Sequence, residues 1–196
     1  MGPDLLLDAA HRLLEKLPPA KVTRAEVARE AGVDPSLIRY YFRDRTSLLH
    51  AVVARLMKQW AEQRDNDAEG GSAAERLRAR VRSVFQFIAT QPYVHKLLVQ
   101  EIAVSTSSRA RQTFHSVNHS AIDRYAKILR DGAKDGTLRK MDPVLLHIAV
   151  IGMSEFFFES RPLLDDAFGK GAVPAAYVKR YGDFVADLVV EGLRRH

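Results

Sequence analysis

Cysteine is absent from this 196-residue chain. Its absence excludes disulfide bonds, thiolate metal ligands and cysteine nucleophiles. The sequence also lacks the Gly-rich loop that cradles phosphates and the GxSxG turn of serine hydrolases, and its first residues do not resemble a signal peptide. We therefore expect a cytoplasmic protein that is not an enzyme and that uses no cofactor.

Long apolar runs are scarce as well. The most apolar stretch, 144–158, is shorter than the roughly 20 residues that cross a bilayer, and it contains His147 and Glu155. Hydrophobic residues at 46% and charged residues at 28% are typical of soluble globular proteins, and we expect no membrane partner. The net charge of +6 favours a polyanionic partner, but it divides equally between residues 1–60 and the rest.

Neither the histidines nor the arginines form a recognised site motif. His115 and His119 have the i, i+4 spacing that can place two imidazoles on one metal, but no HExxH motif and no third ligand accompany them. Two exposed histidines explain the spacing better, so we expect no metal. A set of alternating arginines is expected to be a solvated helix surface: Arg76, Arg78, Arg80 and Arg82.

Helical periodicity extends over most of the chain, and no segment has the alternation of a strand. Capping boxes, such as Ser72 with Glu75, and prolines at helix starts mark where the segments begin, and Pro162 is expected to mark the end of one. Helices are predicted at about 5–17, 23–31, 35–43, 45–60, 72–91, 93–104, 108–132, 142–160 and 174–189, with a polar linker at 65–72. The predicted fold class is all-α, with about nine helices.

The segment 23–49, TRAEVAREAGVDPSLIRYYFRDRTSLL, is the most informative part of the sequence. Thr23 and Glu26 form a capping box, which predicts the start of a helix. Gly32 can adopt the left-handed conformation that ends a helix, and Asp34 with Pro35 predicts that another begins at once. Two short helices around a tight glycine turn are the arrangement of a helix-turn-helix.

The second helix of this motif has a polar face suited to nucleic acid. Ile38, Tyr41 and Phe42 fall on one side, and the opposite side carries Ser36, Arg39, Tyr40 and Arg43. Arginine can grip guanine O6 and N7 with two hydrogen bonds, and Leu37 at the flank can touch a thymine methyl. Any amphipathic helix also shows polar groups to solvent. The placing of small residues and a tight turn favours DNA binding over that alternative.

Residues 27–49 resemble the DNA-binding region of TetR/AcrR-type transcriptional regulators. The family pattern is IA-x-x-AGV, a Ser or Thr cap, a Tyr/His-rich segment and SKE-x-L, and the resemblance covers about Leu5 to Leu56. It implies that Thr23 and Tyr41 hold DNA phosphates, and that Arg45 occupies the phosphate-binding lysine position. It also implies that four residues face the major groove: Ser36, Leu37, Arg39 and Tyr40. Departures from the pattern include Asp34 for Ser, which adds a negative charge near the expected DNA surface.

The resemblance implies two domains, a three-helix helix-turn-helix DNA-binding domain at 1–50 and a helical ligand-binding and dimerisation domain at 51–196. The helix that starts at Arg45 would connect them. The helix at 144–158 has apolar side chains on all sides, so a second surface must cover it. A central core helix is one explanation, and we prefer a homodimer. The eighth and ninth predicted helices of two chains would form a four-helix bundle, as the resemblance also implies.

Family members usually bind a small molecule in the larger domain, which releases the DNA. Candidate lining residues are Phe85, Phe114, Asn118, Tyr125, His147, Met153 and Phe157. Most such residues at helical spacing are ordinary core. We therefore predict a homodimeric, sequence-specific DNA-binding repressor that an unidentified small-molecule ligand releases from a near-palindromic operator. The alternative is a helical-bundle binding protein or enzyme whose N-terminal helices are structural only.

Overall fold

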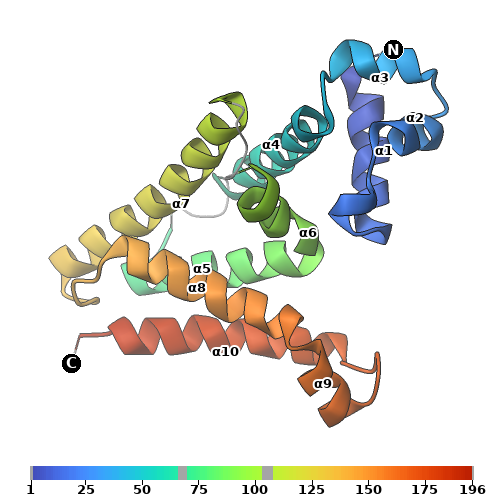
Figure 1. Cartoon of the computed structure of the whole chain (residues 1–196). Helices are drawn as coiled ribbons and strands as arrows, with labels where there is room; N and C mark the ends of the chain where they lie inside the picture. The colour runs from blue at the N-terminus through green and yellow to red at the C-terminus, as the bar shows by residue number, and fades with distance from the viewer. Residues whose placement is uncertain (1, 66–69, 103–107, 196) are drawn as a thin grey trace. The chain divides into compact units, whose positions relative to one another are not determined.

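The computed structural model describes residues 2–65, 70–102 and 108–195 (Figure 1). Every helix or strand element assigned within these ranges is helical, and a lone antiparallel bridge joins Leu138 to Arg194. The predicted all-α fold is confirmed. Residues 66–69 of the predicted linker and the end of the predicted 93–104 helix lie outside the described residues.

Ten α-helices occur in the described ranges. They are α1 (Pro3–Lys16), α2 (Arg24–Ala31), α3 (Pro35–Tyr41), α4 (Arg45–Asp65), α5 (Ala73–Thr90), α6 (Pro92–Lys96), α7 (Ser108–Asp135), α8 (Pro143–Glu159), α9 (Arg161–Phe168) and α10 (Ala175–Leu193). A 3-10 turn, η1 (Pro19–Lys21), precedes α2, and a π-helical segment, η2 (Leu97–Ile102), continues α6.

Of the α-helices in the described ranges, α9 is the one that the sequence did not predict. Pro162 was expected to end the preceding helix, but it lies in the first turn of a new one, where a missing amide hydrogen costs nothing. Ser160 ends α8, and the chain bends by 55° between α8 and α9. Among the described residues, no single helix has the length and apolar composition to cross a membrane, although this bent pair passes the same test together. The predicted eighth and ninth helices correspond to α8 and α10.

The chain divides into two compact units. Unit 1 comprises residues 1–63 and 91–117, and unit 2 comprises residues 64–90 and 118–196. Helix α4 continues without a break through residue 50, and α7 contributes to both units. The functional boundary at residue 50 stays a prediction.

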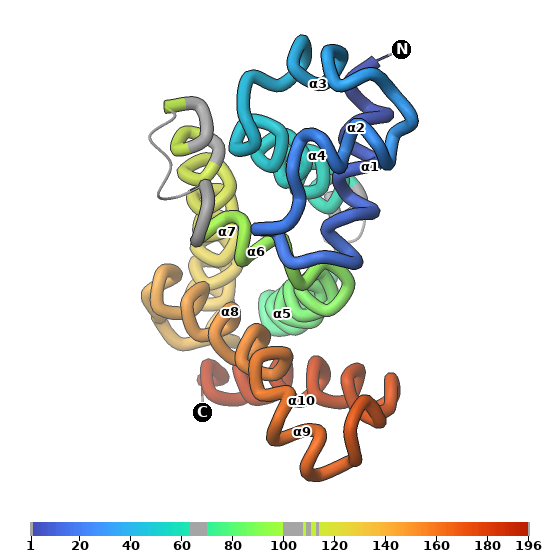
Figure 2. Tube along the Cα trace, turned by 45° about the vertical axis from the view of Figure 1, so that its right-hand side comes forward, coloured from blue at the N-terminus to red at the C-terminus, as the bar shows by residue number. Residues whose placement is uncertain are grey.

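Unit 1 holds the helix-turn-helix segment. Helix α2 packs on both α1 and α3, which lie beside it in Figure 2. An ion pair between Arg55 and Asp8 at 2.8 Å joins α4 to α1, and another between Arg12 and Glu30 at 2.9 Å joins α1 to α2. The buried core includes Leu6, Ala10, Val22, Val27, Ala28, Leu48 and Val52. Short helices are therefore held by a shared core rather than by their own stability.

Unit 2 is built on α5, α8 and α10, which pack against one another (Figure 1). The expectation of a solvated arginine surface on α5 holds for Arg82, which is exposed, and is wrong for the buried Arg80, while Arg76 and Arg78 are half-buried. Arg76 bonds Asp131 at 3.0 Å, Arg78 bonds Asp187 at 2.7 Å, Arg82 bonds Asp183 at 2.7 Å, and Arg80 is buried. Alternate positions do spread around the helix, but acidic residues of α7 and α10 lie opposite Arg76, Arg78 and Arg82.

Candidate nucleic-acid interface

The turn between α2 and α3 is built by local hydrogen bonds. The Glu26 amide donates to Thr23 Oγ1 at 3.2 Å, and the Thr23 amide donates to Glu26 Oε2 at 3.4 Å, which completes the predicted capping box. Gly32 ends α2 with φ +67° and ψ +33°, a left-handed conformation that favours glycine. Asp34 then caps α3, because its Oδ1 accepts the Ser36 amide at 2.7 Å.

Helix α3 presents the polar face that its periodicity predicted. Ile38 and Phe42 are buried, while Ser36, Arg39 and Arg43 are exposed. Tyr40 is 81% exposed, an unusual position for a large aromatic ring. Its ring meets the half-buried Tyr41 ring edge-on, with centroids 5.0 Å apart. Leu37 is half-buried at the flank, and Thr23 is exposed at the start of α2.

An acidic group borders this face. The Ser36 hydroxyl and backbone amide hydrogen-bond to the Asp34 carboxylate and hold its pKa below its usual range, and the Arg39 charge acts in the same direction. Asp34 is therefore ionised near neutral pH. Its charge strengthens the cap of α3 through the helix dipole.

The Arg45 guanidinium was expected to point toward a DNA phosphate, but it bonds backbone carbonyls of this chain instead. Its Nε donates to the Val22 carbonyl at 3.0 Å, and its Nη2 donates to the Pro19 carbonyl at 2.6 Å. The side chain is half-buried against the loop between α1 and α2. The phosphate role of Arg45 stays a prediction.

Sequence reasoning missed Arg24, whose Nη1 donates to the carbonyls of Phe42 at 3.2 Å and Arg43 at 2.7 Å. One signal was present in the sequence. Arg24 and Arg45 each occupy the first residue of a helix, where a positive charge opposes the helix dipole. A guanidinium in that position is better explained by partners outside its own helix.

The predicted ligand-binding residues fall into separate groups. Phe85 and Phe157 lie in an aromatic cluster with Tyr181, whose ring centroid is 5.6 Å from that of Phe85 and 4.4 Å from that of Phe157. The Tyr181 hydroxyl donates to the carbonyl of Met153 at 3.0 Å. Burial raises the pKa of Tyr181. Phe85, Met153 and Phe157 therefore meet around one tyrosine.

Tyr125 and His147 form a second group, with ring centroids 5.9 Å apart. The guanidinium carbon of the buried Arg80 lies 5.5 Å from the centroid of the fully buried Tyr125 ring. Burial lowers the pKa of Arg80, and the like charge of Arg124 adds to this effect. Sequence reasoning assigned Arg80 to solvent and so missed it.

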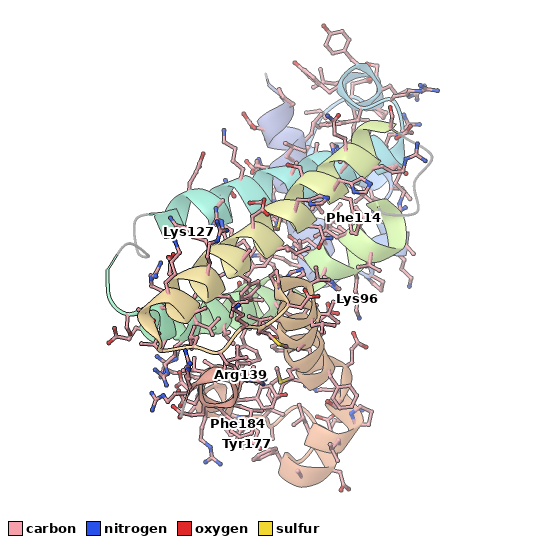
Figure 3. The ribbon with its side chains drawn as sticks, turned by 90° about the vertical axis from the view of Figure 1, so that its left-hand side faces the viewer. Lys96, Phe114, Lys127, Arg139, Tyr177 and Phe184 are labelled. Atoms are coloured by element: carbon pink, nitrogen blue, oxygen red, sulfur yellow. The ribbon has the colours of Figure 1, made fainter. Side chains whose placement is uncertain are left out.

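The other two candidates, Asn118 and Phe114, are half-buried residues of α7. Asn118 belongs to unit 2, whereas Phe114 lies on the part of α7 that belongs to unit 1 (Figure 3). Within residues 2–65, 70–102 and 108–195, no group of three or more His, Cys, Asp or Glu side chains is arranged to hold a metal ion.

Two family models match the chain in succession. The model of the tetracyclin repressor-like C-terminal domain matches residues 74–189, and the model of bacterial regulatory proteins of the tetR family matches residues 6–52. The chain belongs to the TetR family. The second match includes α2 and α3, so the motif predicted from the sequence is the one that the family model covers.

A curated relative matches less than half of this TetR-family chain. HTH-type transcriptional regulator BetI of Escherichia coli (strain K12 / DH10B) is 34% identical over 83 residues, which are 41% of this chain and 43% of BetI. The chain thus spans less than half the length of the curated relatives it matches.

Solved structures share the fold of the TetR-family chain over nearly its whole length. FadR from Bacillus subtilis, solved with stearoyl-CoA, has a TM-score of 0.74 at 18% identity and covers 98% of this chain and 100% of its own. A transcriptional regulator from Saccharomonospora viridis, solved with choline, has a TM-score of 0.76 at 17% identity, with coverage of 98% and 97%. AibR, solved with isovaleryl coenzyme A and operator DNA, has a TM-score of 0.69 at 16% identity, with coverage of 97% and 96%.

Proposed function

We propose that this TetR-family chain is a sequence-specific, DNA-binding transcriptional repressor that works as a homodimer in the cytoplasm. The outward face of α3 carries the proposal. It displays hydroxyl, guanidinium and phenol groups on a short helix whose two ends are fixed, with Tyr40 81% exposed. An exposed aromatic ring beside an arginine contributes little to the core, and its hydroxyl is suited to contact with a duplex.

Each residue assigned to this surface has a role that fits its chemistry. Ser36, Leu37, Arg39 and Tyr40 face the major groove, and Arg39 is suited to guanine O6 and N7. Thr23 and Tyr41 flank this surface and contact backbone phosphates, which position the helix without reading sequence. These contacts make affinity fall steeply with added salt.

The homodimer forms through α8 and α10. Leu145 is 57% exposed, Ile148 61% and Phe156 68%, and their spacing places all three on one side of α8. On α10, which carries the Phe184 labelled in Figure 3, Phe184 is 57% exposed. Leu188 on the same helix is 51% exposed. Two apolar helix faces of this size favour burial against a second copy. A two-fold axis then presents two α3 helices to a near-palindromic operator.

A small-molecule effector binds in unit 2, where an aromatic cluster and the polar group of Arg80, Tyr125 and His147 offer apolar and polar contacts. Ligands in solved structures of this fold support this part of the proposal. An effector should raise the melting temperature of the chain and weaken its DNA binding. If no compound in a broad metabolite screen does both, the chain binds DNA without an effector.

The test of DNA binding starts with selection of a duplex from a random-sequence pool by the full chain. This selected duplex is compared with a scrambled duplex of the same composition. Arg39→Ala with Tyr40→Ala should abolish preference for the selected duplex while helicity and dimer mass stay unchanged. Unchanged affinity of the double variant would refute the proposed surface and favour a helical-bundle protein whose N-terminal helices are structural only.

A further inference from the structure

We propose that Arg24 and Arg45 are positioning residues that brace the helix-turn-helix from opposite sides, and that neither guanidinium is a phosphate contact. The inference rests on the proposed DNA-binding function. It assigns to Arg45 a role different from the one that the family resemblance implies, and it gives Arg24 a role that no motif suggests.

Arg24 holds the far end of α3. It is the first residue of α2, yet its Nη1 reaches the carbonyls of Phe42 and Arg43, 18 and 19 residues along the chain. Phe42 is the C-cap of α3, so Arg24 satisfies carbonyls at the helix end that have no partner within the helix. Through this bond, α2 fixes the C-terminal end of α3 as the Gly32 turn fixes its beginning.

Arg45 holds the entry to α2 in the same way. It is the first residue of α4, and its Nε and Nη2 bond the carbonyls of Val22 and Pro19 in the loop before α2. The two braces are reciprocal. Each arginine is the first residue of one helix and binds the loop that precedes the other's helix, so one guanidinium holds the loop before α2 and the other holds the loop between α3 and α4.

The length of α3 explains why such braces matter. It has seven residues, and helices that short do not persist in water without outside support. Its apolar anchors are Ile38 and the C-cap Phe42, which lie on one side only. The angle of α3 in a groove therefore depends on how its ends are held, and base contacts are lost by small shifts of the helix.

The geometry also argues against phosphate as the target of these guanidiniums. Their bonds, 2.7 Å from Arg24 to Arg43 and 2.6 Å from Arg45 to Pro19, aim Nη1 of Arg24 and Nε and Nη2 of Arg45 at carbonyls within the fold. Turning either side chain away to DNA breaks the brace and leaves the partly buried carbonyls of Phe42, or of Val22 and Pro19, without these donors.

Salt dependence separates the two roles. Arg24→Gln and Arg45→Gln each remove one charge, and Arg29→Gln removes the same charge from an α2 side chain that is 79% exposed and faces Glu26 at 3.7 Å. Affinity for the selected and scrambled duplexes is measured across salt concentrations. Both test variants should bind the selected duplex roughly tenfold more weakly than Arg29→Gln, as if one base contact were lost. Their salt slopes should equal that of Arg29→Gln. A slope lower by about one would show a lost phosphate contact and overturn the proposal.

Lysine variants give a second test, in which the positive charge of each side chain is kept. In Arg24 a single nitrogen bonds both carbonyls, so the ammonium of Arg24→Lys should recover most of the affinity. In Arg45 two nitrogens bond carbonyls that are three residues apart in the chain. A lysine has only one nitrogen at its end, so Arg45→Lys should not recover the DNA affinity. Equal recovery by both lysines would mean that charge alone matters, which contradicts the braces.

Hydrogen exchange tests the braces without DNA. Amides of α3 should exchange faster in Arg24→Gln than in Arg29→Gln, while those of α10 stay unchanged. Unchanged exchange in α3 would refute the brace even if DNA binding fell. If instead Arg39→Ala with Tyr40→Ala leaves DNA affinity unchanged, the proposed DNA-binding surface is refuted. The exchange rates of the α3 amides still test whether Arg24 holds α3.

Discussion

At the scale of single residues, Gly32 determines whether α3 can follow α2 directly. Its φ of +67° lies where an L side chain is strained, although the space around it is open. Gly32→Ala should therefore destabilise the fold by about 1 kcal/mol through the backbone alone. Gly32→Asn should lose less, because asparagine tolerates the left-handed conformation. Urea unfolding measures both, and equal losses would contradict a conformational cause.

Local hydrogen bonds around this turn were predictable, and the braces were not. Thr23 bonds Glu26 and Asp34 bonds Ser36, each within three residues, so spacing alone identifies the partners. Arg24 and Arg45 bond carbonyls 18 to 26 residues away. Such pairs depend on how helices pack, which the periodicity of one helix does not specify.

At the scale of elements, Gly182 allows α10 to approach α5. A Cβ added there would lie 2.5 Å from Cδ1 of the buried Phe85 ring. Gly182→Ala should destabilise unit 2 by about 1–3 kcal/mol through overpacking.

Gly192 on the same helix is the matched control, since an added Cβ meets nothing within 4 Å and its φ is not positive. Gly192→Ala should be neutral or slightly stabilising. Melting temperature compares the two variants. An equal effect would show that the close approach to Phe85 does not limit the packing.

The helix boundaries were predicted correctly where capping residues and hydrophobic periodicity agreed. The prediction failed where one residue type is compatible with both the end and the start of a helix. Ser72 and Glu75 bond reciprocally at the start of α5, as their spacing indicated. Pro162 ended one helix in the prediction but opens α9 in the structure, because proline is equally compatible with both positions. For the ligand candidates, periodicity identified buried faces, but a helical stripe cannot tell pocket from core.

At the scale of the whole molecule, the apolar faces of α8 and α10 predict the assembly. Ile148→Asp with Phe156→Asp places charges on side chains that are 61% and 68% exposed in one chain. The folded monomer tolerates them, whereas a homodimer would have to bury them without partners. Sedimentation should show a shift from dimer to monomer, with weaker DNA binding.

Gln86→Glu supplies the control, because it adds a negative charge at an exposed position of α5, outside α8 and α10. It should leave the dimer intact. A wild-type mass for the double aspartate variant would place the interface elsewhere.

The most direct measurement is hydroxyl-radical footprinting of the selected duplex by the full chain. Two copies of α3 related by a two-fold axis should protect two patches centred roughly 34 Å apart, one helical turn along the duplex. Arg39→Ala with Tyr40→Ala should lose both patches while keeping its dimer mass. A single patch, or an unchanged footprint from the double variant, would contradict the account.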